Sequence, residues 1–132
     1  MDEEKELTLI CVGEEEKVNS LRELVPFQSD MIIFTVDEHV ADEVRACGFE
    51  STYCCDKELN ITSICSGIKK VILLGDELPT VSFFTERIRF FFQAPITVVT
   101  RNKSYPVRLY QTIGAKFVVF TNCDNISFLF FE

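Results

Sequence analysis

Acidic residues and one arginine follow several apolar runs of this chain, at positions where they could contact a ligand or a cation. Asp56 and Asp76 each come directly after such a run, and Arg101 follows another. A carboxylate at the end of a strand can accept hydrogen bonds from a ribose or hold a cation, and it can equally cap a helix. Arg101 could clamp an anionic ligand, although a surface salt bridge, for example with Asp76, is the commoner role.

The turn after the first apolar run stands where a parallel α/β fold usually binds a phosphate group, but its acidic residues disfavour phosphate binding. Gly13 is followed by Glu14, Glu15 and Glu16. A glycine-rich turn holds phosphate because its N–H groups approach closely and the helix N-terminus favours negative charge. Three carboxylates repel phosphate; they could hold a divalent cation, and more often such a run is a favourable charge set at a helix start. Gly13 is either the remaining phosphate-loop glycine or a turn residue with positive φ.

The remaining reactive side chains do not form a recognisable catalytic or metal-binding pattern. The only histidine, His39, has no serine or cysteine at a suggestive spacing, and we interpret it as a surface residue. The six cysteines do not follow zinc-ligand spacing. Cys11 and Cys54 fall inside apolar runs, where cysteine usually acts as a small buried hydrophobic residue. We therefore predict no catalytic residue, no metal ligand and no enzymatic activity.

Short apolar runs alternate with segments of helical periodicity along most of the chain. The predicted strands are residues 7–12, 31–36, 51–55, 71–74, 96–100 and 117–120. The predicted helices are residues 15–24, which Pro26 should end, 39–47, 58–65, about 80–92 and about 104–113. This alternation requires crossover connections and a parallel sheet with helices on both faces. The fold class is therefore α/β, a three-layer Rossmann-like, doubly wound parallel sheet of about six strands.

The two ends of the chain and its length suggest one soluble domain. Residues 1–6 are expected to form a solvated acidic leader and residues 7–132 a single domain, with residues 126–131 as an extra edge strand or an apolar tail. The acidic N-terminus is unlike a signal peptide. No apolar run is long enough to cross a bilayer. We expect a cytoplasmic protein without direct membrane insertion, although it could be part of a membrane complex.

The composition excludes one class of partner and favours another. The formal net charge is −8, so nucleic-acid binding, which depends on Lys and Arg neutralising phosphates, is not expected. The chain has 13 phenylalanines, and those in residues 83–92 are too many for one helix face. The apolar tail, residues 128–131, would add an exposed edge that invites pairing. We therefore expect a homodimer or a larger homo-oligomer.

Part of the chain resembles the second half of a response-regulator receiver domain. The segments concerned are Val71 to Pro79, Pro95 to Thr100 and Ile113 to Ala115. This resemblance would make Asp76 the phosphoacceptor, Thr100 the switch hydroxyl, and Glu14 and Glu15 the metal carboxylates. A receiver, however, has one strand–helix unit fewer before Val71 and a lysine after its last strand. The receiver domain is therefore kept as an alternative.

Residues 7–121 are more similar to the TrkA-N family, the RCK-type Rossmann domain that regulates potassium channels and transporters. An ordered series carries the resemblance: Val36-Asp37-Glu38, Gly48-Phe49-Glu50, Cys55-Asp56, Ile68 to Asp76, Ile96 to Tyr105 and Ile113 to Val119. The resemblance implies a non-enzymatic regulatory domain that senses a nucleotide or an ion. It also implies an adenine nucleotide or NAD as the ligand and a membrane transport protein as a partner.

The resemblance further implies which residues would contact the ligand, and several depart from the family's pattern. The glycine loop would lie at residues 12–17 and keeps only Gly13. The ribose-binding acid falls on Thr35, with Asp37 two residues later, and Asp56 follows Cys55 where the family has glycine. The candidate ligand-binding residues are Gly13, Thr35, Asp37, Asp56, Gly75, Asp76 and Arg101. We expect dinucleotide binding to be weakened or lost, and a ligand-free dimeric scaffold is a second alternative.

Overall fold

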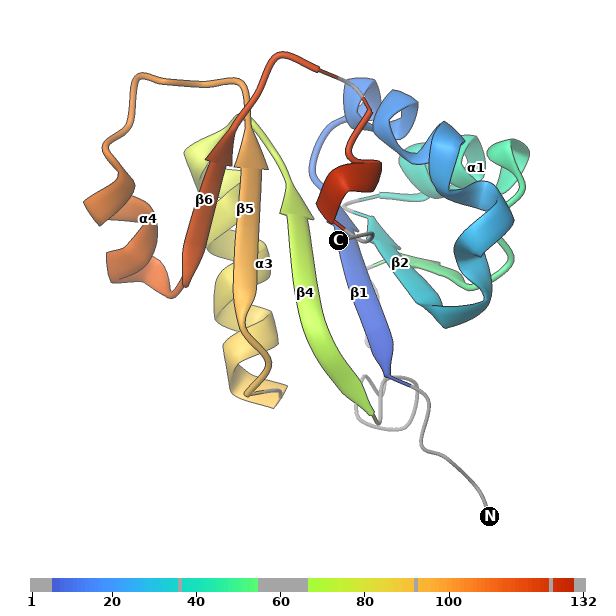
Figure 1. Ribbon diagram of the computed structural model, residues 1–132, viewed down its shortest axis with the longest axis horizontal. Helices are drawn as coiled ribbons and strands as arrows, with labels where there is room; N and C mark the ends of the chain where they lie inside the picture. Colours follow the sequence, from blue (N-terminus) through green and yellow to red (C-terminus); the bar gives the residue numbers. More distant parts are fainter. Residues whose placement is uncertain (1–5, 36, 55–66, 92, 124, 130–132) are drawn as a thin grey trace.

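The strand–helix alternation folds into a six-stranded, all-parallel sheet in the order β3-β2-β1-β4-β5-β6 (Figure 1). The computed structural model describes residues 6–35, 37–54, 67–91, 93–123 and 125–129. The strands are β1 (Leu7–Val12), β2 (Met31–Thr35), β3 (Thr52–Cys54), β4 (Ile68–Leu74), β5 (Ile96–Thr100) and β6 (Phe117–Phe120). This order is that of a doubly wound Rossmann sheet, which confirms the predicted fold class.

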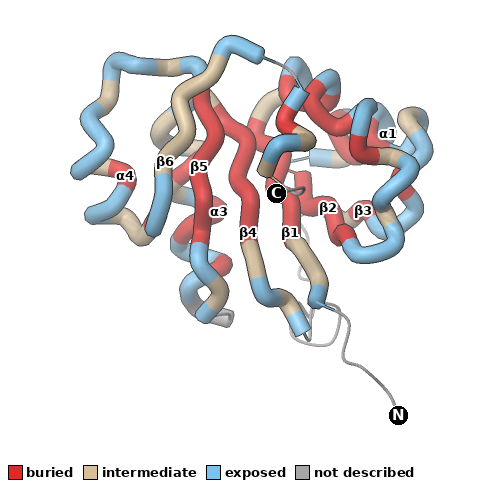
Figure 2. Tube along the Cα trace, viewed as in Figure 1, coloured by how far each residue is buried: buried red, intermediate tan, exposed pale blue. Residues whose placement is uncertain are grey.

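Helices cover both faces of the sheet, so its central strands are buried on both sides. The helices are η1 (Glu15–Asp30), α1 (Glu38–Cys47), α3 (Leu78–Phe91), α4 (Val107–Ile113) and η2 (Ser127–Leu129). On one face, Phe84 of α3 and Tyr110 of α4 pack in a core with Leu73. On the other face, Leu21 of η1 packs with Ile10 in a core that α1 also joins. Figure 2 shows the buried residues concentrated in β1, β2, β4 and β5.

The first helical segment differs from the prediction in type and length. It is a 3-10 helix, η1 (Glu15–Asp30), made of two helical stretches that meet at a kink, where Phe27 has non-helical backbone angles. Its buried apolar residues Val18, Leu21 and Leu24 are spaced by three residues, which matches the three residues per turn of a 3-10 helix. Proline fixes φ at a value that a 3-10 helix accepts. The helical backbone is nevertheless interrupted at Phe27, directly after Pro26, which agrees with the prediction that Pro26 ends the first helix; a second helical stretch then runs to Asp30.

Of the two alternatives for residues 126–131, an edge strand or an apolar tail, the strand is wrong for the described part, where Ser127–Leu129 form the short helix η2. The Asn125 side chain accepts a hydrogen bond from the backbone N–H of Ser127 (3.0 Å), which turns the chain. Ile126 is buried in the core beneath η1 and α1. The Lys70 ammonium donates to the Leu129 carbonyl, so η2 is held across the face of the sheet instead of extending its edge (Figure 1).

Other boundaries shift by a few residues. β4 begins at Ile68, three residues before the predicted start, and α3 begins at Leu78. The predicted helix 58–65, most of the predicted leader and Asp56 lie outside the described residues. None of the helices in the described part of the chain combines the length and the apolar character needed to traverse a bilayer.

Gly114 ends α4, as predicted, and its conformation makes substitution unfavourable. Its φ is +124°, and a Cβ there would lie 2.4 Å from Arg89 Cδ and 2.8 Å from Thr85 Cγ2. We expect Gly114→Ala to lower the free energy of unfolding by about 1–2 kcal/mol through left-handed strain and crowding. Urea denaturation measures the loss. Gly48→Ala is the control, because Gly48 has a similar φ of +117° and a Cβ there would meet, among the described residues, only Val25 Cγ1 at 3.1 Å. An equal or larger loss at Gly48 would contradict the crowding argument.

Candidate functional site

The candidate site lies where the winding of the sheet reverses, at the carboxyl ends of β1 and β4. Val12 and Leu74 are register partners at the ends of these strands. The Gly13 N–H donates to the Leu74 carbonyl (2.8 Å), and the Gly75 N–H donates to the Val99 carbonyl (3.1 Å). Doubly wound α/β proteins bind their ligands outside the strands at this reversal. The turns that follow β1, β4 and β5 therefore form the edge where a ligand would be expected.

Gly13 is held against the turn after β4 by close packing. A Cβ at Gly13 would lie 2.9 Å from the Leu74 carbonyl oxygen and 3.1 Å from Thr80 Cγ2. Its φ is not positive: the glycines with positive φ in the described residues are Gly48, Gly67 and Gly114. The interpretation of Gly13 as a positive-φ turn residue was therefore wrong, and the structure shows a packing requirement instead.

Asp76 is the centre of a hydrogen-bond network that joins the turns after β4 and β5 to η1. Its Oδ1 accepts hydrogen bonds from the Lys17 ammonium (2.7 Å), the Arg101 backbone N–H (2.8 Å) and the Thr100 hydroxyl (3.2 Å). The Asn102 side-chain amide donates to the Asp76 carbonyl (2.9 Å). Two of the predicted site residues, Asp76 and Arg101, are thus brought together, with Arg101 contributing its backbone.

Glu14 extends its carboxylate into the turn after β4. Its Oε1 accepts a hydrogen bond from the Asp76 N–H (2.6 Å). Its Oε2 is buried and has no hydrogen-bond partner among the described residues. A Cβ on Gly75 would lie 3.3 Å from this oxygen, so the absence of a side chain at Gly75 makes room for the Glu14 carboxylate. We call Glu14, Lys17 and Asp76 the crevice cluster.

The two carboxylates of the crevice cluster have different electrostatic environments. Burial raises the pKa of Glu14 above its ordinary value, and the hydrogen bond from Asp76 only partly opposes this effect. Burial acts in the same direction on Asp76, but the hydrogen bonds from Lys17, the Arg101 N–H and Thr100 outweigh it and lower the pKa of Asp76. With one ammonium between two carboxylates, the ionised cluster carries net negative charge and opposes a phosphate group.

The raised pKa of Glu14 predicts how a Glu14→Gln variant responds to pH. Because the folded-state pKa lies above the unfolded value, the ionised carboxylate destabilises the fold as pH rises through that range. Glutamine keeps the acceptor for the Asp76 N–H but cannot ionise. We expect Glu14→Gln to gain stability relative to the wild type between pH 4 and pH 7, measured by urea denaturation at each pH.

The exposed η1 residue Glu23 provides the control for this experiment. A Glu23→Gln variant should show no comparable gain, since its carboxylate is solvated in the folded chain. The electrostatic interpretation would be contradicted if the stability of Glu14→Gln, measured relative to the wild type, fell as pH rises from 4 to 7.

Thr35 and Asp37, the positions implied for ribose binding, are engaged in local structure. Thr35 is fully buried at the end of β2, and its hydroxyl donates to the Asp37 carbonyl (3.0 Å). The Asp37 carboxylate accepts the Val40 N–H (2.9 Å) and so caps α1. This capping gives Asp37 a structural role at the start of α1 through Oδ1. Asp56 lies outside the described residues.

Sequence analysis missed two residues of the network, Lys17 and Asn102, and the buried Tyr110 beside it. Lys17 has a side chain only 9% exposed, although it follows three glutamates in a surface helix; its only sequence signal is its position one turn after Glu14. Asn102 links Asp76 to Thr100, whose hydroxyl accepts the Asn102 N–H (3.0 Å). Tyr110 is buried beside Thr100, and burial raises the pKa of its phenol although Thr100 opposes the shift; the two hydroxyls do not reach hydrogen-bond geometry.

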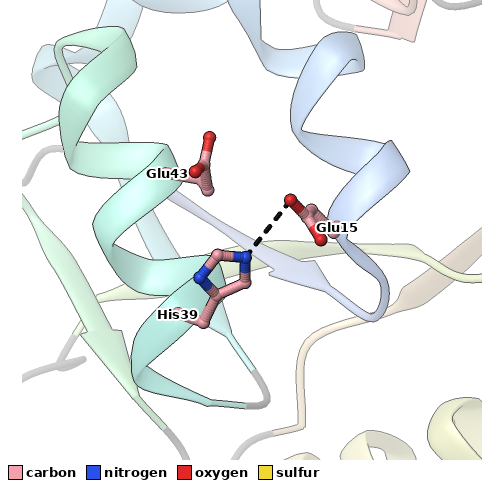
Figure 3. Close-up of side chains that lie close together, drawn as sticks. All are labelled: Glu15, His39 and Glu43. Atoms are coloured by element: carbon pink, nitrogen blue, oxygen red, sulfur yellow. Dashed lines mark ion pairs between the residues drawn. The ribbon is translucent and has the colours of Figure 1, made fainter.

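A second group of polar side chains lies on the surface between η1 and α1. His39 Nε2 is 3.2 Å from Glu15 Oε1, and Glu43 lies nearby (Figure 3). The hydrogen bond and the negative charge of Glu15 raise the pKa of His39. His39 is exposed, which confirms its interpretation as a surface residue, but it has a partner that the sequence did not indicate.

Comparison with known proteins supports the fold. No protein-family model matches the chain, and no curated protein matches it. Among solved structures, the chain is similar to one described as the crystal structure of the GsuK RCK domain, with a TM-score of 0.57 and 14% sequence identity. The match covers 90% of this chain and 27% of that one, so this chain spans about a quarter of its structural neighbour. At this identity the likeness establishes a shared fold.

Proposed function

We propose that this chain, which has the Rossmann-like fold seen in an RCK domain, is a non-enzymatic regulatory domain for potassium transport. In this proposal the chain acts through contacts with other proteins. The crevice at the carboxyl ends of β1 and β4, where a Rossmann domain binds a dinucleotide, is filled by side chains of the chain itself. The fold supports the regulatory class, because RCK domains are regulators. The crevice cluster supports the loss of dinucleotide binding.

One observation carries the proposal. Where a Rossmann domain presents glycine N–H groups to a pyrophosphate, this chain places the Glu14 carboxylate on the Asp76 N–H at 2.6 Å and the Lys17 ammonium on Asp76 Oδ1 at 2.7 Å. A pyrophosphate would have to displace both contacts and approach two carboxylates. Since the Asp76 N–H and the Lys17 ammonium are already paired with carboxylates of the chain, neither is available to a pyrophosphate in this arrangement.

The proposed partners are a second copy of this chain and a membrane transport protein. Large apolar side chains are exposed on several elements: Phe27, Phe83, Val107, Phe117 and Phe128. Phe117 begins β6, the last strand of the sheet order, and is 55% exposed. Aromatic residues at an exposed sheet edge favour self-association. The side chains of Phe90, Phe91 and Phe92, which also motivated this expectation, lie outside the described set.

Thermal denaturation with NAD, NADH, ATP, ADP and AMP, run beside light scattering, tests the proposal. A ligand of the folded state raises stability by about 2.7 kcal/mol at a hundredfold excess over its Kd. We expect no shift of the wild-type transition with any of these nucleotides, and a mass of at least twice that of the chain. A nucleotide-dependent shift that disappears in Asp76→Ala would show that the crevice still binds a ligand. A monomeric mass at high protein concentration would contradict the proposed self-association of the chain.

The receiver alternative is supported by one contact, the hydrogen bond from Thr100 to Asp76 (3.2 Å). The strand order argues against it, because receivers have the order 2-1-3-4-5, whereas here three strands precede β4 and the order is Rossmann-like. Incubation with Mg²⁺ and acetyl phosphate, followed by mass spectrometry, distinguishes the two. We expect no phosphorylated product; a product that is absent in Asp76→Asn would restore the receiver interpretation.

A further inference from the structure

We propose that Glu15, His39 and Glu43 form a binding site for a divalent transition-metal ion, for which Zn²⁺ is the best fit. The site lies between η1 and α1, separate from the crevice cluster, and it is independent of the proposed function. Sequence analysis predicted no metal ligand, because the cysteines do not follow zinc-ligand spacing and the chain has a single histidine. The fold supplies the third side chain from another element.

Two elements bring the three side chains together. His39 and Glu43 are four residues apart on α1, so they lie on the same side of the helix. The start of α1 is fixed by the Asp37 cap, directly before these residues. Glu15 is the first residue of η1 and reaches across to His39 (Figure 3). The group is thus not a run of acidic residues at one helix end, since its members come from two packed elements.

The distances are close to those of a three-ligand site. His39 Nε2 and Glu15 Oε1 are 3.2 Å apart, and the ligand atoms of all three residues lie within 4.8 Å of one another. Ligands around a tetrahedral Zn²⁺, with bonds of about 2.0–2.2 Å, are separated by about 3.3–3.6 Å. The His39–Glu15 pair is already near this spacing, and Glu43 is exposed, so its side chain is free to turn toward the other two.

The donor set selects the class of ion. One imidazole nitrogen and two carboxylates suit Zn²⁺ and similar transition metals, whereas Ca²⁺ and Mg²⁺ take oxygen ligands almost throughout. Three protein ligands leave a fourth position for water. All three side chains are exposed, so an ion and its water have direct access. The arrangement predicts an open site of moderate affinity.

The surroundings of the group also favour a cation. An open groove beside it is lined by Glu15, Glu16, Val18, Asn19, Arg22 and Glu43, in which three carboxylates face a single guanidinium. Asp37 adds a further negative charge that acts on His39. A bound ion would offset this excess of negative charge and join η1 to α1. Because Glu15 directly follows Glu14, the ion would also hold the first turn of η1 beside the crevice cluster.

Isothermal titration of the wild-type chain with ZnCl₂ at pH 7 tests the site. We expect one ion per chain, with a more than tenfold weaker Kd in His39→Ala and in Glu43→Gln, since loss of even an outer-shell partner of a zinc site costs about 10–100-fold. Both side chains are exposed, so both variants should fold as the wild type does, which circular dichroism checks. Glu23→Gln, an exposed carboxylate of the same helix η1, is the matched control and should bind as the wild type does.

Titration with Co²⁺ separates this site from one made by cysteines. Binding at Glu15, His39 and Glu43 should give absorption bands of nitrogen and oxygen ligands without a thiolate charge-transfer band. The proposal is overturned if the chain does not bind Zn²⁺, if His39→Ala and Glu43→Gln bind it as tightly as the wild type, or if the Co²⁺ spectrum shows thiolate ligands. None of these outcomes depends on the nucleotide measurements, so the two proposals fail separately.

Discussion

Asp76→Ala is expected to lower the free energy of unfolding by about 3 kcal/mol. The substitution removes the acceptor of three hydrogen bonds and leaves the ammonium of Lys17, whose side chain is only 9% exposed, without this partner. Removing one member of a buried ion pair costs about 3–5 kcal/mol, and we take the lower end because Asp76 is 32% exposed. Urea denaturation at pH 7 measures the loss, with an unchanged m value indicating that the folded state stays compact.

A double-mutant cycle with Lys17→Met identifies the cause of this loss. Methionine has the length of the lysine stem but no charge, so Asp76→Ala combined with Lys17→Met does not bury an unpaired ammonium. We expect the double variant to be more stable than the sum of the two single losses predicts. Strictly additive losses, or a loss below about 1 kcal/mol in Asp76→Ala, would contradict the assignment of Asp76 as the centre of the network.

The lowered pKa of Asp76 gives this loss a pH signature. A carboxyl group whose pKa is depressed in the folded state stabilises the fold fully above its unfolded pKa, and this contribution disappears as pH falls through the folded value. The ordinary value for the group is 3.8. The difference in stability between the wild type and Asp76→Ala should therefore be constant near neutral pH and shrink as pH falls below about 4.

The fold could be predicted from the sequence because its strands are buried on both faces. Runs such as Met31–Thr35, in which every residue is buried, are continuous in apolar and β-branched residues and allow few other interpretations. The short segment at residues 126–129 lacked such a constraint. A run of that length fits a strand or a turn of helix equally well, and the Asn125 side chain, together with burial of Ile126, decided between them.

The crevice cluster was only partly predictable. The position of Asp76 followed from the end of an apolar run, and the opposition of Glu14 to phosphate followed from its charge. Their direct contact did not follow, because the Asp76 N–H and the Glu14 carboxylate are 62 residues apart in the chain. Lys17 gave no signal, since a lysine in a surface helix is usually solvated. A local pattern can place residues at a sheet edge, but the pairing across that edge depends on the packed structure.

Gly13 and Gly75 have a different role from the glycines of a phosphate loop. Such a loop uses glycine so that the backbone can approach a pyrophosphate. In this chain Gly13 approaches the Leu74 carbonyl, and Gly75 makes room for the Glu14 carboxylate. The glycines thus allow close contacts between protein atoms, and their substitution should affect stability whether or not a nucleotide is present.

Gly13→Ala is accordingly expected to destabilise the chain by about 2–3 kcal/mol. The new Cβ would lie 2.9 Å from the Leu74 carbonyl oxygen, which is fixed because it accepts the Gly13 N–H at 2.8 Å. Forcing these turns apart is an overpacking effect of about 1–3 kcal/mol, and it also weakens the contact between β1 and β4 that positions the crevice cluster. Urea denaturation without any nucleotide measures the loss.

Gly75→Ala serves as the comparison for this prediction. Its Cβ would meet Glu14 Oε2 and Val81 Cγ2 at 3.3 Å, and both are side-chain atoms that can give way, so a smaller loss is expected. The double variant Gly75→Ala, Glu14→Gln should likewise lose less stability than Gly13→Ala. If Gly13→Ala were as stable as the wild type, the close approach of the two turns would not require glycine. The alternative interpretation of Gly13, as the remaining phosphate-loop glycine, would then be favoured, and the proposal of a closed crevice would lose its strongest packing argument.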